Sequence, residues 1–127
     1  MRTTIKAALA ATLLTSTVLG GVALAPAANA TTGPQRQAIG TAYDYLDFTH
    51  FSKAGLSDQL QYEGFSRSVS NYAVNHIKVS WNNQAVGSAK DYLRYSHFSC
   101  SGLIDQLEYE KFTAAQARYG AHHTRAC

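Results

Sequence analysis

HFSKAGLSDQLQYEGF occupies residues 50–65, and the closely similar HFSCSGLIDQLEYEKF occupies residues 97–112. The two stretches are offset by 47 residues, and when 37–76 is aligned with 84–123, twenty of the forty positions are identical. This agreement indicates a tandem duplication, in which each copy forms one structural unit. The repeat motif consists of Phe51, Ser52, Gly55, Leu56, Gln59, Leu60, Glu63 and Phe65, and of their counterparts Phe98, Ser99, Gly102, Leu103, Gln106, Leu107, Glu110 and Phe112.

The spacing of apolar residues predicts three short helices in each copy. Over residues 34–50, Ala38, Ala42 and Leu46 fall on one helical face. No stretch shows the sustained alternation of apolar and polar residues that is typical of strands. We therefore expect an all-α protein built from two tandem three-helix repeats that pack together.

The second helix of the first copy, over about 53–63, has recognisable signals at both ends. Ser52 is suited to cap its first turn, and the preceding Phe51 can close over the cap as a hydrophobic staple. Gly64 is placed to end it in a left-handed conformation. The second copy has Lys111 at this position, so we expect its helix to end differently.

The core expected for each copy is small. A three-helix unit of about 45 residues is marginal by itself. We therefore expect Trp81, which lies at the boundary between the copies, to fill the space between them. The predicted core residues are Leu46, Phe51, Leu56, Leu60, Phe65, Tyr72 and Ile77, with the counterparts Leu93, Phe98, Leu103, Leu107, Phe112, Tyr119 and Thr124.

The first thirty residues have the features of a secretory signal peptide. Arg2 and Lys6 precede an uncharged, largely apolar stretch over residues 7–25, and Ala28 and Ala30 define a small-residue cleavage site after Ala30. An uncleaved membrane anchor is the alternative, because the apolar stretch is about long enough to span a bilayer. The predicted organisation is a signal peptide at 1–30, a first repeat at 31–79 and a second at 80–127.

Cleavage would bring the chain close to electrical neutrality. It removes two of eleven Lys and Arg residues and none of the eight Asp and Glu residues, which leaves nine against eight and a net charge of +1. This balance does not support a broad phosphate-binding surface. Cys100 and Cys127 are the two cysteines; in an exported protein they favour a disulfide, and two free thiols are the alternative.

The sequence offers no convincing active site or metal site. The five histidines lack the spacing of zinc ligands, and His122 and His123 are adjacent, so on a helix they point about 100° apart. Cys100 with His97 is the sharpest candidate for a nucleophile, but a disulfide is a simpler use of the thiol. We predict no catalytic residue, cofactor or metal.

A repeated polar pattern remains, and its role is left open between structure and ligand binding. We expect Gln59 to bond to a loop backbone. The pattern comprises Asp44, Asp58, Gln59, Tyr62 and Glu63, which match Asp91, Asp105, Gln106, Tyr109 and Glu110.

The doubled motif FS-x-x-GL-x-x-QL, followed by Glu and Phe, resembles the Ltp family of host cell surface-exposed lipoproteins, whose repeats are called helix-turn-helix regions. The YAV sequence at 72–74, Trp81-Asn82 and Gln84-Ala85 also match that family's pattern. The resemblance covers about residues 37–121 and implies small helical repeats displayed outside the cell. In a phage-encoded member it implies superinfection exclusion, in which the phage tape-measure protein is engaged and passage of phage DNA is blocked.

The chain departs from this family at the cleavage site. A lipoprotein requires a cysteine there for acylation, and here Thr31 and Thr32 follow Ala30. We therefore expect a secreted protein, extracellular or associated with the cell wall, without a stable membrane anchor.

Three functions follow from these observations. The leading hypothesis is a non-catalytic binding module for a protein or cell-envelope partner, which includes the possibility of a phage protein. Superinfection exclusion is the alternative. Nucleic-acid binding is suggested only by the helix-turn-helix term, and export and near-neutral charge argue against it.

Overall fold

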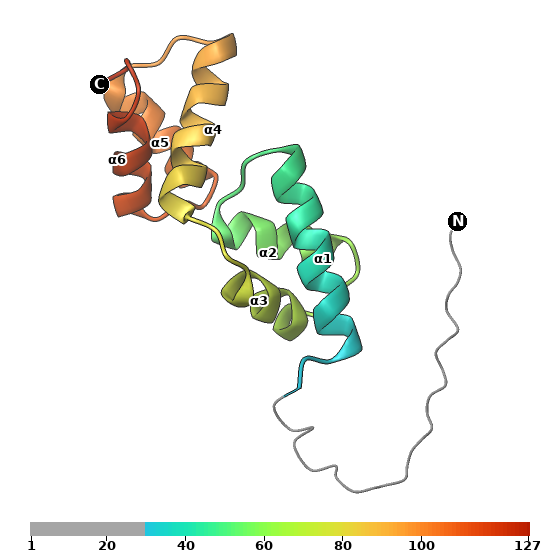
Figure 1. Ribbon diagram of the computed structural model, residues 1–127. Helices are drawn as coiled ribbons and strands as arrows, with labels where there is room; N and C mark the ends of the chain where they lie inside the picture. The colour runs from blue at the N-terminus through green and yellow to red at the C-terminus, as the bar shows by residue number, and fades with distance from the viewer. Residues whose placement is uncertain (1–29) are drawn as a thin grey trace, which may run out of the picture. The chain divides into compact units, whose positions relative to one another are not determined.

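The computed structural model describes residues 30–127, which form six helices (Figure 1). The described residues contain no strand, so the predicted all-α fold of two three-helix repeats is confirmed. The predicted signal peptide lies outside the described residues, except for Ala30 at its end. No described helix is both long and apolar enough to cross a membrane. The helices are α1 (Gly33–Phe48), α2 (Lys53–Tyr62) and α3 (Arg67–His76) in the first repeat, and α4 (Trp81–Tyr95), α5 (Cys100–Tyr109) and α6 (Ala114–His122) in the second.

A serine or threonine side chain caps the N-terminus of every described helix. Each cap oxygen accepts a hydrogen bond from the backbone N–H three residues later, which satisfies one of the donors that a first turn leaves unpaired. At α1 and α6 a glutamine side chain completes a capping box. The caps are Thr32, Ser52, Ser66, Ser80, Ser99 and Thr113.

The second helix of each repeat ends in the same way, contrary to the expectation for Lys111. Gly64 has a φ of +109° and Lys111 a φ of +77°, so both residues adopt the left-handed conformation. In each repeat the following phenylalanine N–H bonds to the carbonyl of a leucine on the helix, at 3.1 Å. The shared hydrogen bonds impose the turn on lysine although a side chain disfavours it.

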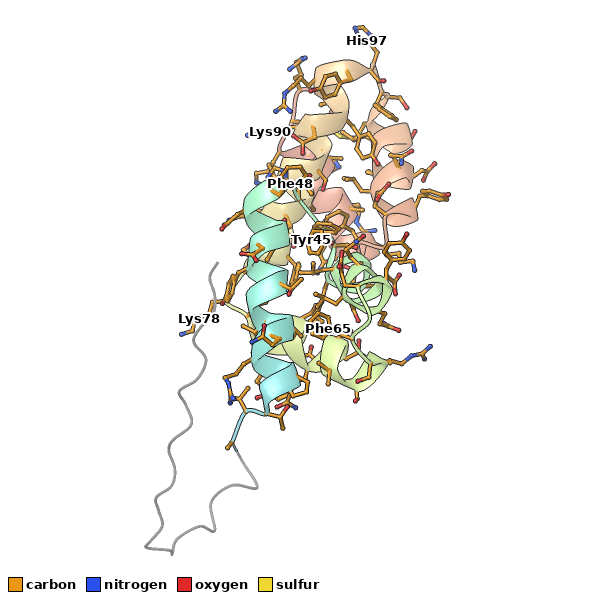
Figure 2. All side chains as sticks on the ribbon, turned by 90° about the vertical axis from the view of Figure 1, so that its right-hand side faces the viewer. Tyr45, Phe48, Phe65, Lys78, Lys90 and His97 are labelled. Atoms are coloured by element: carbon orange, nitrogen blue, oxygen red, sulfur yellow. A yellow bond between two sulfur atoms is a disulfide. The ribbon has the colours of Figure 1, made fainter. Side chains whose placement is uncertain are left out.

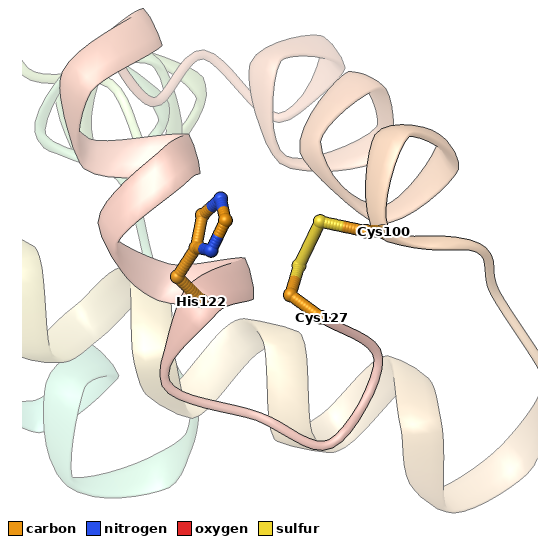
Figure 3. A group of neighbouring side chains, drawn as sticks. All are labelled: Cys100, His122 and Cys127. Atoms are coloured by element: carbon orange, nitrogen blue, oxygen red, sulfur yellow. A yellow bond between two sulfur atoms is a disulfide. The ribbon is translucent and has the colours of Figure 1, made fainter.

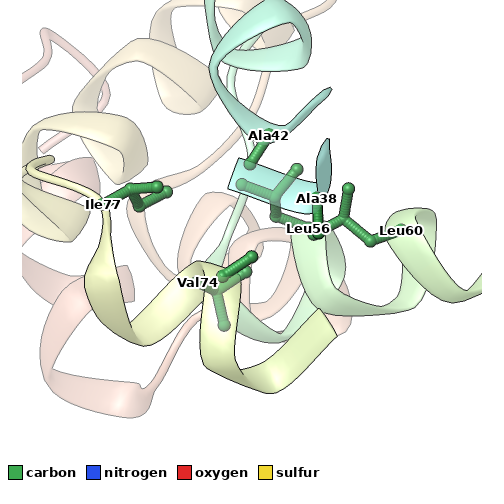
Figure 4. Packing of buried hydrophobic residues seen from close by; sticks show 7 residues of the cluster. Ala38, Ala42, Leu56, Leu60, Val74 and Ile77 are labelled. Atoms are coloured by element: carbon green, nitrogen blue, oxygen red, sulfur yellow. The ribbon is translucent and has the colours of Figure 1, made fainter. Parts of the chain in front are cut away.

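Each repeat has its own hydrophobic core. Leu56 and Leu60 are fully buried in the first repeat, where Ala38 and Ala42 of α1 lie against them (Figure 4). Leu103 and Leu107 have the same place in the second repeat. The first core consists of Ala38, Ala42, Leu56, Leu60, Ala73, Val74 and Ile77, and the second of Ala85, Ala89, Leu103, Leu107, Phe112, Ala117 and Ala121.

Several large residues lie at the edges of these cores rather than inside them. Leu46, Phe51 and Phe65 are half-buried against the first core. Tyr119, predicted to be internal, is 38% exposed. Its ring stacks on His123 at 4.0 Å between centroids, so it lies along the outside of α6. Alanines occupy the space where the helices approach most closely, which leaves little room for large rings.

The closely packed helix pairs are α4 with α6, α1 with α3, α5 with α6 and α2 with α3, each within one repeat. Trp81 is the exception to this separation, because it begins α4 and packs against the core of the first repeat. The repeats therefore meet through a tryptophan and through loop contacts described below, rather than by sharing one core.

A disulfide joins Cys100, the first residue of α5, to Cys127 beyond the end of α6 (Figure 3). The Cα atoms are 4.7 Å apart and the two residues are 27 positions apart in the chain. The predicted disulfide is thus confirmed, and it ties the C-terminal segment to the start of α5.

Candidate binding site at the junction of the repeats

A tyrosine, a glutamine and a glutamate form the same hydrogen-bond network in both repeats. In the second repeat the Tyr92 hydroxyl donates to Glu110 at 2.6 Å and accepts from Gln106 Nε2 at 3.0 Å. In the first, the Tyr45 hydroxyl donates to Glu63 and accepts from Gln59 Nε2 at 3.1 Å. Gln59 therefore bonds to a side chain, not to the loop backbone that we expected.

These networks hold the first two helices of each repeat together. Each tyrosine also meets the motif phenylalanine edge to face: Tyr45 lies 5.7 Å from Phe51, and Tyr92 lies 5.8 Å from Phe98, between ring centroids. The hydrogen bond to Glu63 raises the pKa of Tyr45 above 10.0, and burial with the bond to Glu110 raises the pKa of Tyr92. Both phenols stay protonated and serve as donors.

The loop before α2, together with α2 itself, forms non-covalent contacts with the second repeat. Ser52 Oγ, which also caps α2, donates to the Glu110 carbonyl oxygen at 2.5 Å. The Phe51 N–H donates to Gln84 Oε1 on α4 at 2.9 Å. Lys111 forms an ion pair with Asp58 on α2. Lys111, the counterpart of Gly64 in the second repeat, thus contacts the first repeat.

His50 adds a second contact across the junction. Its Nδ1 lies 2.8 Å from the Asp91 carboxylate on α4, which also accepts a hydrogen bond from Arg94 at 2.9 Å. Burial alone would raise the pKa of Asp91, but the hydrogen bonds from His50 and Arg94 hold it below its ordinary value of 3.8. Gly87 leaves the space for the His50 ring, since a Cβ there would lie 2.2 Å from it.

Two of the open grooves at this junction are lined by exposed tyrosines. The first has a volume of about 340 Å³, and Tyr62 and Tyr109, at equivalent positions of the two repeats, both line it. Their side chains are 86% and 81% exposed. The second has a volume of about 460 Å³ and includes Tyr95, which is 82% exposed. The first groove is lined by Gly55, Asp58, Gln59, Tyr62, Tyr109, Glu110 and Lys111, and the second by Thr49, His50, Ser88, Asp91, Tyr92, Tyr95 and Glu110.

The structure divides the repeated polar pattern into two roles. Gln59 and Glu63, with Gln106 and Glu110, hold Tyr45 and Tyr92 in place. Tyr62 and Tyr109 project from the helices and are free to contact a partner. The sequence pattern contained both tyrosines but did not indicate that they meet at one groove. The sequence indicated the junction through Trp81, which packs against the core of the first repeat, and did not indicate the ion pair of Lys111 with Asp58.

The other candidate for chemistry lies at the disulfide. Cys100 Sγ is bonded to Cys127, so this cysteine carries no thiol in this state. The ring of His122 lies beside the disulfide, and the potential ligand atoms of the three residues all fall within 4.8 Å of one another (Figure 3). Thiolates bind metals, whereas disulfide sulfurs do not serve that role. The exposed His97 does not take part in this cluster.

Comparison with known proteins accounts for this arrangement of repeats. The family model for the host cell surface-exposed lipoprotein, Ltp, matches residues 34–77 and 80–123. The chain belongs to the Ltp family. The structure of Ltp, a superinfection exclusion protein from the Streptococcus thermophilus temperate phage TP-J34, has a similar fold with a TM-score of 0.69. The two are 31% identical, and the match covers 74% of this chain and 98% of the phage protein's chain.

The search of curated proteins found no match. The family description supports a location at the cell surface or outside the cell. The two segments matched by the Ltp family model correspond to α1–α3 and α4–α6. Each match to the family model therefore covers one three-helix repeat.

Proposed function

We propose that this Ltp-like chain is a secreted, non-catalytic binding module that takes a protein partner at the groove between Tyr62 and Tyr109. The observation that carries the proposal is the convergence of two equivalent tyrosines, one from each repeat, on one groove. Each is more than four-fifths exposed, so each ring can lose a large apolar area to a partner. Tyrosine provides such contacts at low conformational cost.

The charges around the junction favour a partner segment that carries Lys or Arg. Glu110 lines both grooves, and among residues 30–127 its carboxylate accepts hydrogen bonds only from the uncharged Tyr92 and Gln106. The charges of Asp58 and Asp91, in contrast, are already paired with Lys111 and Arg94. A cationic side chain can stack on a tyrosine ring and reach a carboxylate at the same time. The first groove, at about 340 Å³ and open to solvent, fits protruding side chains of a protein better than it encloses a small molecule.

Affinity capture with matched variants tests this proposal. The exported protein is immobilised as wild type, as the double variant Tyr62→Ala with Tyr109→Ala, and as Phe48→Ala. Phe48 is 87% exposed but does not line either groove, so it controls for the loss of an exposed aromatic side chain (Figure 2). Proteins from the outside of the producing cell and from phage particles are applied at several salt concentrations, and retained proteins are identified by mass spectrometry.

We expect one retained species to bind the wild type and Phe48→Ala and to be lost from the double variant. Two hot-spot tyrosines are together worth about 4 kcal/mol, or roughly a thousandfold in affinity. Identical retention by all three proteins would remove the groove as the binding site.

Superinfection exclusion is a second candidate, and the similarity to the phage TP-J34 protein favours it, because that protein is described as a superinfection exclusion protein. Cells that export this chain are challenged with phage, and adsorption and DNA uptake are measured separately. Exclusion predicts normal adsorption with reduced DNA uptake, and the double tyrosine variant should restore uptake. Unchanged DNA uptake in cells that export the wild type would argue against this function.

We propose further that the chain is released or retained by the cell wall, since Thr31 and Thr32 replace the acylated cysteine of a lipoprotein. Fractionation of producing cells should find it in the medium or wall fraction with the mass of an unlipidated chain that begins at Thr31. Recovery with the membranes, or a lipid-sized increase in mass, would contradict this.

A further inference from the structure

The two repeats differ at the gap between their first helix and the segment that follows their third helix. In the first repeat the Tyr43 hydroxyl on α1 accepts a hydrogen bond from the Lys78 backbone N–H at 2.9 Å. This bond bridges α1 and the chain beyond α3. At the offset of 47 residues, Lys90 replaces Tyr43 and Arg125 replaces Lys78. The second repeat thus has a lysine in place of the closing tyrosine, while the other position carries a cation in both repeats.

An open pocket of about 790 Å³ lies at this place in the second repeat. Lys90 and Arg94 line it from α4, and His123 and Arg125 line it from the C-terminal segment. None of its lining residues is acidic. Among residues 30–127 no carboxylate pairs with Lys90 or Arg125, whereas Arg94 is bonded to Asp91 and remains 59% exposed. In the first repeat the position of Arg94 is Asp47, so of the three cationic positions the first repeat keeps only Lys78.

We propose that this pocket binds phosphate groups of an anionic, phosphodiester-linked polymer of the cell envelope. Lys and Arg are the side chains that hold phosphate oxygens, Arg through paired donors and Lys as a point charge. The mature chain has a predicted net charge close to zero, so a cluster of three cations, of which Lys90 and Arg125 have no carboxylate partner among the described residues, is a local feature rather than a consequence of overall charge.

The pocket has room for a polymer segment that carries several phosphates. A bare phosphate would leave most of about 790 Å³ empty, while a repeating unit with two neighbouring phosphates can engage cations on both walls. None of the lining residues is shared with the two junction grooves, so a protein partner and a polymer can bind at the same time. The pocket would retain the chain at the envelope without a lipid anchor.

Fluorescence anisotropy with labelled linear poly(glycerol phosphate) tests the proposal on the exported protein with its disulfide intact. The variants are Lys90→Ala, Arg125→Ala and their combination, and Lys78→Ala is the matched control because it removes one charge at the position equivalent to Arg125 (Figure 2 labels Lys78 and Lys90). Lys90→Tyr reintroduces the residue of the first repeat. Thermal melts followed by circular dichroism verify that each variant is folded.

We expect each removed pocket charge to weaken binding about fivefold at low salt, and the double variant to weaken it about 25-fold. The salt dependence of the binding constant should become shallower with each charge removed. Lys78→Ala should bind as the wild type does, and Lys90→Tyr should bind as weakly as Lys90→Ala.

Three results would overturn the proposal. If Lys78→Ala weakens binding as much as Arg125→Ala, the polymer is held by general charge and not by the pocket. If inorganic phosphate competes as effectively as the polymer at equal phosphate concentration, the ligand is a free anion. If duplex DNA of equal charge binds as tightly through the same residues, the pocket selects no envelope polymer. None of these results bears on the tyrosine groove.

Discussion

Replacement of Gly120 by alanine should destabilise the second repeat by forcing α4 and α6 apart. Gly120 is buried in α6, and an added Cβ would lie 2.7 Å from the carbonyl carbon and oxygen of Ala85 on α4. It would also lie 2.8 Å from the Ala85 Cβ. Carbon atoms in ordinary contact are about 3.5–4.0 Å apart. The opposing atoms include backbone, so no side-chain rotation can relieve the overlap.

The magnitude follows from two opposing effects. Overpacking a well-packed core costs about 1–3 kcal/mol, and a clash with backbone belongs at the upper end of that range. Alanine in place of glycine inside a helix stabilises by up to about 1 kcal/mol. The expected net loss in the free energy of unfolding is therefore about 2 kcal/mol. For a chain of this size it corresponds to a decrease in Tm of roughly 10 °C.

Gly40 in α1 provides the matched control. It is a helical glycine as well, but an added Cβ there meets nothing within 4 Å. Gly40→Ala should therefore keep the gain of up to about 1 kcal/mol without the clash. The difference between the two variants, about 3 kcal/mol, isolates the cost of packing because the helix propensity cancels.

The assay is urea unfolding of the exported protein and both variants, with the disulfide intact and tryptophan fluorescence and circular dichroism as independent probes. Coincident transitions justify a two-state treatment. If Gly120→Ala unfolds at the same or higher urea concentration than the wild type, α4 and α6 do not approach as closely as the structure shows.

Three other perturbations should have measurable effects. Replacing Cys100 and Cys127 together by serine removes a loop constraint and should lower the free energy of unfolding by about 3 kcal/mol in urea, whereas an unchanged midpoint would show that the disulfide adds nothing. Gly64→Ala forces a side chain into a φ of +109° and should cost about 1 kcal/mol or more in the same assay; a neutral result would argue against the left-handed turn. The pKa of Asp91 is lower in the folded state, so its stabilising contribution is present above pH 3.8 and is lost as the pH falls through the folded pKa. Asp91→Asn should therefore make the free energy of unfolding depend less steeply on pH in this acid range. An unchanged pH dependence would contradict the contact with His50.

Much of the fold could be predicted because its signals are local. A serine or threonine precedes each described helix, and the burial of Leu56 and Leu60 follows from their spacing. The left-handed Lys111 could not be predicted from residue preference, because non-glycine residues rarely adopt it. It results from the same hydrogen bonds that close the turn at Gly64, which become visible only in the structure.

The candidate site was harder to predict because it depends on contacts between non-equivalent positions of the two copies. His50 contacts Asp91, 41 residues away, and Ser52 contacts Glu110, 58 residues away. The spacing of apolar residues within one repeat does not indicate which residues of the two repeats contact each other. The sequence indicated which residues are repeated, but the place where the repeats meet depends on the three-dimensional path of the loop before α2.

The duplication has therefore produced equivalent scaffolds with unequal roles. Ser52 both caps its helix and reaches Glu110 across the junction, while its counterpart Ser99 caps α5 and is exposed. His50 is engaged by Asp91, and its counterpart His97 is exposed with no hydrogen bond to its ring among residues 30–127. Two copies joined in tandem have only one junction. A position that lies at the junction in one copy can therefore be exposed to solvent in the other, and selection can act on the two differently. Functional differences should thus be sought where the repeats diverge beside that junction, and a substitution tested in one repeat does not stand for its equivalent in the other.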